Sequence, residues 1–262
     1  MRPSKSLAKW RAGKPVLGTT LHVADPSVYE MVSLMGFDLI WMDLEHHAHS
    51  VETAGGLMRA ARVGGADIIA RPAKGEFMRL ARLLEAGAQG IMYPRCTSAE
   101  EAAMVVQNAK FPPMGDRGLD GAGPDMPYGL TDLKTYLTAA NEETFIAIQI
   151  EDKAGVDQAE AIAATNGVDL LFFGPGDYSI RNGFAGNFED ERYWEAVQRV
   201  ADAAAAAGKW WGTPAFHAAH ARRLLEMGAM LVTRSSDMSL LRITFDGLKS
   251  EFGELGFTFD PR

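Results

Sequence analysis

Two carboxylates in the middle of the chain stand where they could bind one metal ion together. Glu151 follows an apolar run at residues 145–150, and Asp177 closes the turn that follows a second run at 168–173. A helix-length segment separates the runs, as two neighbouring parallel strands require. Such strands lie about 4.8 Å apart, so the two side chains should converge. Two carboxylates suit Mg²⁺ or Mn²⁺, whose remaining positions are left to water and substrate oxygens.

Other chemically competent residues also stand at the ends of apolar runs. Asp43 and His46 follow the run at 37–42, Arg71 ends a run that begins at residue 67, and Gln149 lies two residues before Glu151. An acid, a base, a permanent cation and the two carboxylates that could bind a metal would then lie together at one end of the strands. That set suits formation of an enolate beside a carboxylate, because a metal can hold an α-keto acid, a base can move a proton and arginine can neutralise the developing charge.

The elements that must position these residues form a regular alternation. Apolar runs begin near residues 16, 38, 67, 90, 146, 168, 210 and 229, and a helical segment follows each run. The pattern predicts a single-domain (β/α)₈ TIM barrel over residues 1–262, whose reactive groups lie at the carboxyl ends of the strands. A doubly wound open sheet is the alternative, but no Gly-rich nucleotide fingerprint opens any of the helices.

Composition narrows the classes of partner. The formal charge of −8 and a pI near 5.3 argue against nucleic acid and anionic membrane surfaces, which select basic patches. Residues 1–15 carry basic charge without an apolar segment, and no stretch reaches the roughly 18 apolar residues of a membrane span. A single cysteine, Cys96, permits no internal disulfide. We expect a cytoplasmic protein that acts on a small molecule.

Local signals add detail at several places. Asp25 before Pro26 predicts a helix start, and Ser98 with Glu101 forms a capping box. The Gly- and Pro-rich segment 114–128 is too long for an ordinary connection, which favours a functional loop. The last helix, at 240–252, has an apolar stripe that could cover the bottom of the barrel or pack on a neighbouring subunit.

Five segments, taken together and in order, resemble the HpcH/HpaI aldolase family, which comprises metal-dependent (class II) pyruvate aldolases. The resemblance spans nearly the whole chain at comparable spacings. The segments are Asp43-Leu44-Glu45-His46, Arg71-Pro72, residues 112–118, Gln149-Ile150-Glu151 and Gly174-Pro175-Gly176-Asp177.

The resemblance implies a reaction and an assembly. Enzymes of this kind, typified by 4-hydroxy-2-oxoheptanedioate and 2-dehydro-3-deoxyglucarate aldolases, reversibly cleave a 4-hydroxy-2-oxo acid to pyruvate and an aldehyde. Cleavage proceeds through a metal-bound pyruvate enolate and needs a divalent cation, Mg²⁺, Mn²⁺ or Co²⁺. The family also implies a homo-oligomer, with a hexamer favoured.

The resemblance further implies roles for individual residues. His46 would be the general base, Arg71 would stabilise the enolate oxygen, and Glu151 and Asp177 would bind the cation. Gln149 and the backbone around Gly176 would hold the substrate. Glu85 stands where the family usually has an aspartate that raises the basicity of the histidine, and Asp43 could also orient His46. The chain departs from the family pattern at Leu44, His47, Ala48, His49 and Gly176, and these departures bear on which aldehyde is accepted.

Plainer interpretations remain open for several residues. Glu151 and Asp177 could cap helices or form ion pairs, and Arg71 could pair with Glu45. His47 and His49 could be ligands or merely solvated, and His22 could line the rim or pack in the core. His217 and His220 could bind metal or cap a helix, and Arg117 could reach an acceptor carboxylate, reach a neighbouring subunit or lie on the surface.

Two other functions compete with the aldolase. A lyase of β-hydroxyacyl-CoA, of the citrate-lyase and malyl-CoA lyase type, would use similar chemistry but needs a site for an adenine nucleotide. A barrel that binds without catalysing would not need the acid, base, cation and metal set that the strand ends carry.

Overall fold

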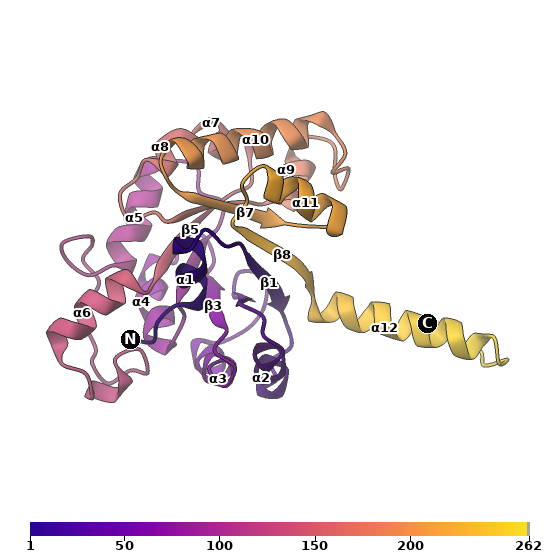
Figure 1. Cartoon of the computed structure of the whole chain (residues 1–262), viewed down its shortest axis with the longest axis horizontal. Helices are drawn as coiled ribbons and strands as arrows, with labels where there is room; N and C mark the ends of the chain where they lie inside the picture. Colours follow the sequence, from indigo (N-terminus) through magenta and orange to yellow (C-terminus); the bar gives the residue numbers. More distant parts are fainter. Residues whose placement is uncertain (261–262) are drawn as a thin grey trace.

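The strands of the computed structural model, which describes residues 1–260, close into a barrel in which each strand pairs in parallel with its neighbours along the chain (Figure 1). The closed parallel barrel confirms the predicted (β/α)₈ fold. The strands are β1 (Val16–Leu21), β2 (Leu39–Asp43), β3 (Asp67–Arg71), β4 (Gly90–Tyr93), β5 (Phe145–Ile150), β6 (Leu170–Phe173), β7 (Trp210–Pro214) and β8 (Leu231–Ser236).

Helices follow the strands and cover the outside of the barrel, with the exception of the two at the ends of the chain (Figure 1). They are α1 (Lys5–Arg11), α2 (Pro26–Leu34), α3 (Val51–Ala61), α4 (Phe77–Ala86), α5 (Ala99–Ala109), α6 (Leu133–Glu142), α7 (Lys153–Asp157), α8 (Ala159–Ala163), α9 (Pro175–Arg181), α10 (Glu191–Ala206), α11 (Ala218–Glu226) and α12 (Asp237–Gly253), with a 3₁₀ turn, η1, at Pro127–Gly129.

Alternation along the strands sends every second side chain into the barrel. The interior cluster includes Leu39 and Trp41 of β2, Ile69 of β3, and Phe145 and Ala147 of β5. The same alternation carries Asp43, Arg71, Gln149 and Glu151 inward at the carboxyl ends of these strands. The polar rim is therefore a continuation of the packed core, and the core holds it in place.

The amino terminus closes the opposite end of the barrel. Residues 1–15 were expected to be a charged leader, but α1 forms there, capped by the Ser4 hydroxyl, and Trp10 is buried among the interior residues. The Trp10 indole donates a hydrogen bond of 2.7 Å to the Met230 carbonyl and packs edge-on against Phe145. A short segment with few apolar residues gave no helical signal, because its one large anchor is a single tryptophan.

Several predicted helix boundaries hold. Asp25 accepts the Ser27 N–H, with Pro26 at the first helical position as predicted. Ser98 accepts the Glu101 N–H, but the Glu101 carboxylate accepts the N–H of Thr97 rather than that of Ser98, so the box closes one residue early. The single helix expected after β5 is split into α7 and α8. Pro175 opens the short helix α9, which was not expected there and which carries Asp177.

The Gly- and Pro-rich loop is held by a buried ion pair. Arg117 donates to Asp125 at 2.8 Å, both side chains are almost fully buried, and the Tyr136 hydroxyl also donates to Asp125. Within one chain, Arg117 is therefore a support inside the loop and is not exposed on the surface.

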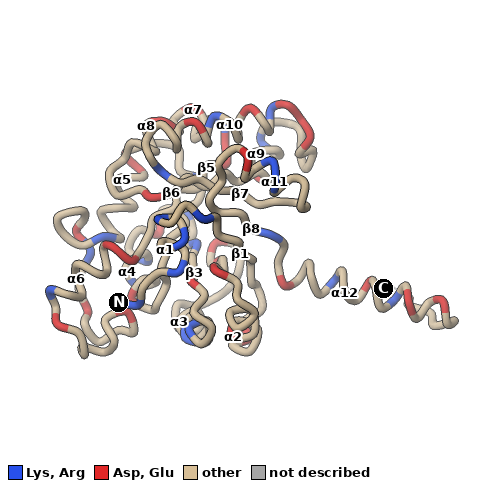
Figure 2. Tube along the Cα trace, viewed as in Figure 1, with Lys and Arg blue, Asp and Glu red and all other residues tan. Residues whose placement is uncertain are grey.

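The terminal helix α12 leaves the body of the molecule (Figure 1). Beyond its first turns it is exposed on all sides, including large apolar residues such as Ile243, Phe245 and Leu248. Acidic and basic residues are interspersed along it and over the barrel (Figure 2). No helix in the described chain, residues 1–260, is both long and apolar enough to cross a bilayer.

Candidate active site

The Asp43 carboxylate and the Arg71 guanidinium form the centre of the rim. Arg71 Nε lies 2.9 Å from one Asp43 oxygen and Nη2 lies 2.8 Å from the other. Burial alone would raise the pKa of Asp43, but the hydrogen bonds and charge of Arg71 outweigh it and hold that pKa to about 2. Arg71 also stacks over Trp41, and its Nη1 donates to Gln149 at 3.4 Å. The guanidinium, carried by β3, is thus fixed by contacts with β2 on one side and β5 on the other.

Glu45 is a second buried carboxylate beside this pair. Its side chain is 4% exposed, and it forms ion pairs with Arg95 at 2.9 Å and with Arg71 at 3.5 Å. The predicted pairing of Arg71 with Glu45 is therefore present, but it is longer than the contact with Asp43. His46 Nε2 lies 3.7 Å from Glu45, and the His46 imidazole is 62% exposed, so it is accessible at the mouth of the barrel.

Arg95 connects this half of the rim to Glu151. Its backbone has φ 50°, a left-handed conformation that is uncommon outside glycine. In that conformation its N–H donates to a Glu151 oxygen at 3.0 Å while its guanidinium reaches Glu45. This role of Arg95 could not be predicted, because an arginine residue carries no signal for a left-handed backbone.

Glu151 is buried and held from two sides. Its second oxygen accepts the Gln149 amide at 2.8 Å. Burial raises the pKa of Glu151 to about 7; Arg71 opposes the rise, and the nearby negative charges of Asp177 and Glu45 reinforce it. A methyl group on Gly174 would lie 2.5 Å from a Glu151 oxygen, so residue 174 must be glycine for Glu151 to keep this position.

Asp177 lies beyond the end of the neighbouring strand, β6. It is in the first turn of α9, is 41% exposed, and has a distant ion-pair contact of 3.7 Å with Arg181. Its negative charge adds to the effect of burial, which raises the pKa of Glu151. The structure therefore brings Glu151, Asp177, Gln149 and Arg71 to one end of the barrel, as the strand-end argument predicted.

This donor set fits a hard divalent cation. Two carboxylates from adjacent strand ends are oxygen ligands, and the remaining positions of Mg²⁺ or Mn²⁺ stay free for water and substrate. The supporting observation is the buried Glu151 carboxylate, which the Arg95 N–H and the Gln149 amide hold in place. Burial raises its pKa, and a bound cation would offset the cost of keeping this buried group ionised. Within residues 1–260, no group of three or more His, Cys, Asp or Glu side chains is arranged so that it could hold a metal ion, so two carboxylates are the protein ligands this rim offers.

Asp43 contacts a different histidine from the one expected. It accepts the backbone N–H groups of Glu45 and His46, at 3.0 and 3.4 Å, but its side chain pairs with the ring of His47 at 3.1 Å. Asp43 therefore shapes the turn that presents His46 without touching the His46 ring. His47 in turn stacks on His22, which lines the rim.

Glu85 lies away from these residues within one chain. It sits in the last turn of α4, which returns to the amino-terminal end of the barrel, and its backbone packs beside Gly123 of the Gly- and Pro-rich loop. Burial raises the pKa of Glu85, and the charge of Arg117 opposes the rise. The chain does not bring Glu85 to His46, whose loop is at the other end.

The remaining histidines and the cysteine have structural roles. His217 caps α11 by accepting the His220 N–H, and His220 Nε2 contacts the Tyr193 hydroxyl at 3.0 Å. The capping interpretation of this pair therefore describes the structure. Cys96 is fully buried, and burial raises the pKa of its thiol to about 12.

The polar rim lies at the carboxyl ends of the strands, where enzymes with a closed parallel (β/α)₈ barrel have their active sites. The family model described as HpcH/HpaI aldolase/citrate lyase matches residues 19–243. The chain belongs to this family, which confirms the resemblance and the prediction of an aldolase-type lyase.

Individual relatives agree with the family model. The chain is 33% identical over 235 residues to the hydroxypyruvate/pyruvate aldolase of Delftia acidovorans, covering 90% of this chain and 87% of that protein. It is 32% identical over 250 residues to the 5-keto-4-deoxy-D-glucarate aldolase of Klebsiella pneumoniae, covering 95% and 97%. The crystal structure of an HpcH/HpaI aldolase from Desulfitobacterium hafniense superposes with a TM-score of 0.89 at 31% identity, covering 94% and 95%.

Proposed function

We propose that this protein is a metal-dependent pyruvate aldolase that reversibly cleaves a 4-hydroxy-2-oxo acid to pyruvate and an aldehyde. The observation that carries the proposal is the position of Arg71, which is fixed by Asp43 at the carboxyl end of the strands and adjoins Gln149 beside Glu151. A guanidinium held there can neutralise an oxyanion that forms next to a carboxylate without having to reorganise. The names of the relatives above support the same class of substrate.

Glu151 and Asp177 would hold the cation, which can be Mg²⁺, Mn²⁺ or Co²⁺. When bound, a divalent cation polarises the keto oxygen of the substrate as a Lewis acid. Gln149 and the backbone at Gly176 would orient the carboxylate of the substrate. Gln149 can do so because its amide is already fixed between Arg71 and Glu151.

His46 would move the proton. In the cleavage direction it would take the proton of the C4 hydroxyl while the C3–C4 bond breaks and the bonding electron pair passes to the pyruvate fragment. Its exposed ring is accessible to a substrate at the mouth, and Glu45 beside it would stabilise the imidazolium that forms. In this assignment Asp43 orients Arg71 and the turn that carries His46.

The test is turnover of 4-hydroxy-2-oxo acids, followed as release of pyruvate, before and after chelation of metals. We expect activity that is lost on chelation and restored by Mg²⁺, Mn²⁺ or Co²⁺, and no covalent trapping when borohydride is added with pyruvate. Trapping on a lysine would contradict the proposal, since Schiff-base aldolases are trapped in this way. Turnover of β-hydroxyacyl-CoA alone would favour the related lyase.

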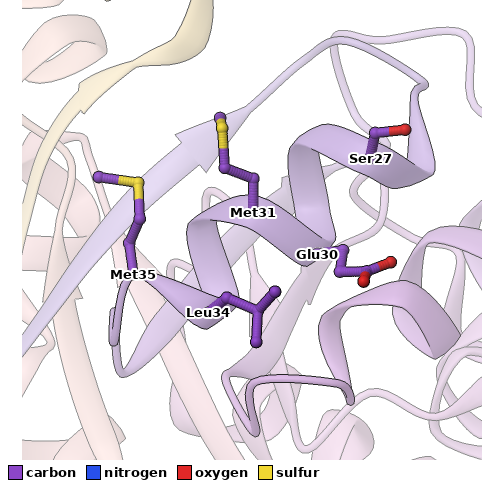
Figure 3. Close-up of a pocket in the computed structure, with 5 residues that line it drawn as sticks. All are labelled: Ser27, Glu30, Met31, Leu34 and Met35. Carbon is purple, nitrogen blue, oxygen red and sulfur yellow. The ribbon is translucent and has the colours of Figure 1, made fainter.

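We also propose a homo-oligomer, with a hexamer favoured, in which α12 packs on a neighbouring subunit. In this barrel the helix after β8 does not return to cover β1 and β8, and a groove beside it is lined by apolar residues of β1, α2 and the first turns of α12. Figure 3 shows Met31 of α2 and Met35, the residue that caps its carboxyl end, at a cavity on the same outer surface. Both methionines are exposed.

The cytoplasm, expected from the single cysteine, is the proposed location.

The assembly is tested by light scattering on matched variants of α12. Phe245→Asp places a charge on the apolar stripe, whereas Ser250→Asp adds the same charge elsewhere on the helix. Phe245→Asp should dissociate the oligomer, and Ser250→Asp should not. A wild-type protein that is monomeric at micromolar concentration would contradict the proposal.

A further inference from the structure

Two histidines from different strands form a parallel stack at the mouth of the barrel. His22 follows β1 and His47 lies in the loop after β2; their ring centroids are 4.0 Å apart and the ring planes differ by 9°. His49 continues the stack, with its ring 6.2 Å from that of His47 and 17° from parallel. The roles assigned so far leave these imidazoles unused.

Each stacked ring turns its Nδ1 toward a buried aspartate. His47 Nδ1 lies 3.1 Å from Asp43, and His22 Nδ1 lies 3.4 Å from Asp237, the first residue of α12. Asp43 is ionised, because Arg71 overcomes the effect of burial and holds its pKa to about 2, so its oxygens can only accept. The proton of neutral His47 therefore sits on Nδ1, and its Nε2 carries a lone pair.

The opposite edges of the rings are open to a ligand. The His22 and His47 side chains are 22% and 33% exposed, whereas the two aspartates are buried. Because Nδ1 of each ring faces a buried aspartate, Nε2 lies on the side of the ring away from that aspartate. Within residues 1–260 neither Nε2 atom takes part in a hydrogen bond.

The charges around His22 favour its neutral form. Burial lowers the pKa of His22, and His47 and His49 lower it further, while Asp237 and Asp43 oppose the shift. A neutral stack offers two hydrogen-bond acceptors side by side. Such a pair matches hydroxyl donors, whereas a carboxylate would need the rings to take up protons first.

The stack is also placed to meet the aldehyde half of the substrate. Asp43 contacts both His47 and Arg71, so the stack adjoins Arg71 on the β1 and β2 side. Glu151 and Asp177 follow β5 and β6, which lie across the closed barrel from β1 and β2. A pyruvate fragment between Arg71 and Glu151 would have the rest of the substrate directed toward the histidines.

We propose that the Nε2 atoms of His22 and His47 accept hydrogen bonds from hydroxyl groups of the aldehyde. The enzyme would then select hydroxylated aldehydes over alkyl aldehydes of the same size. This inference rests on the proposed aldolase function. It assigns substrate specificity to two residues. His47 lies where the loop after β2 departs from the family pattern, and His22 lies at the end of β1.

The experiment compares addition of pyruvate to glycolaldehyde and to propanal, which have the same number of non-hydrogen atoms. The quantity measured is the ratio of kcat/KM for the two aldehydes. His22→Phe keeps a stacking ring and leaves Asp43 untouched, and it should lower this ratio about tenfold, the equivalent of one neutral hydrogen bond. His47→Phe should act in the same direction, and the double variant should accept propanal at least as well as the wild type does.

The matched control is His217→Ser, which removes a histidine elsewhere but keeps a good helix cap. Its ratio should equal that of the wild type. An unchanged ratio in His22→Phe and His47→Phe would overturn the proposal. So would a larger loss with glyoxylate than with glycolaldehyde, because the stack would then bind a carboxylate.

Two further measurements separate this inference from the proposed function. Exchange of pyruvate methyl protons into D₂O needs no aldehyde, so it should persist in His22→Phe; its absence in the wild type would contradict the aldolase function itself. Long-range ¹H–¹⁵N spectra of the imidazoles report the tautomer whether or not the protein is active. Protons on Nε2, or no shift of Nε2 on addition of glyceraldehyde, would overturn the inference.

Discussion

Arg71 of β3 and Asp43 of β2 meet in a two-point ion pair, with Nε and Nη2 lying 2.9 and 2.8 Å from the two carboxylate oxygens. The two residues are partners in the register of the strands, so the barrel backbone itself places them side by side. A planar guanidinium matches both oxygens at once, which a lysine ammonium cannot do.

Arg71→Lys should therefore keep the charge but lose the orientation of the cation. We expect kcat/KM for cleavage to fall by about 100- to 1,000-fold, as is typical when one preorganised donor to an oxyanion is lost. Steady-state kinetics with a saturating cation measure this directly. A change of less than threefold would show that Arg71 serves only to neutralise Asp43.

Gly174→Ala should weaken binding of the cation. The added methyl group would lie 2.5 Å from a Glu151 oxygen and 2.9 Å from the Gln149 amide nitrogen, so the Glu151 side chain must move. A change that disturbs the groups around a metal ligand typically costs about 10- to 100-fold in metal affinity, which titration with Mn²⁺ would measure. Gly56→Ala is the control, since its methyl group would meet no atom within 4 Å. Equal Mn²⁺ affinities in both variants would argue against Glu151 as a ligand.

Glu151 should make the stability of the metal-free protein depend on pH. Its pKa is raised from 4.5 to about 7, mainly by burial, so the folded state binds this proton more tightly than the unfolded state does. The stabilising contribution is complete below pH 4.5 and is lost as pH rises through about 7. Glu151→Gln should remove that loss. The unfolding free energy of the variant minus that of the wild type should therefore increase as pH rises from 4.5 to about 7. Parallel stability curves from urea unfolding would contradict the assignment.

Arg95 offers a separate test of the rim. Its left-handed backbone directs an N–H at Glu151, and glycine adopts this conformation without strain, whereas alanine does not. Both Arg95→Gly and Arg95→Ala lose the ion pair with Glu45. The glycine variant should nevertheless be more stable by about 1 kcal/mol and should bind Mn²⁺ more nearly as the wild type does. Chemical unfolding and metal titration of the two variants measure both effects. An alanine variant that is as stable as the glycine variant, or that binds Mn²⁺ as tightly, would contradict this role of Arg95.

Much of the rim follows from local patterns in the sequence. Asp43, Arg71 and Gln149 each lie two residues beyond an inward-facing core side chain, and Glu151 lies two residues beyond Gln149, so alternation along a strand was enough to direct them to one end. The closing of the barrel follows in the same way from eight repeated strand and helix pairs.

The rest depends on contacts between distant segments, which no local pattern contains. The stacking of His22 on His47 depends on how two loops meet, and the burial of Arg117 depends on Asp125 and Tyr136 reaching it. Ser235, two residues before α12, has a left-handed backbone, φ 61°, which cannot be predicted from a serine. The short helix α9 was not predicted, because its first residues, Pro175 and Gly176, are typical of a turn.

The most direct test of the central claim is exchange of pyruvate methyl protons into D₂O, followed by NMR with Mg²⁺ present and after chelation. If Glu151 and Asp177 hold the cation, we expect exchange in the wild type that stops on chelation and returns with Mg²⁺. We expect no exchange in Glu151→Gln. Exchange that continues at an undiminished rate after chelation, or in Glu151→Gln, would contradict it.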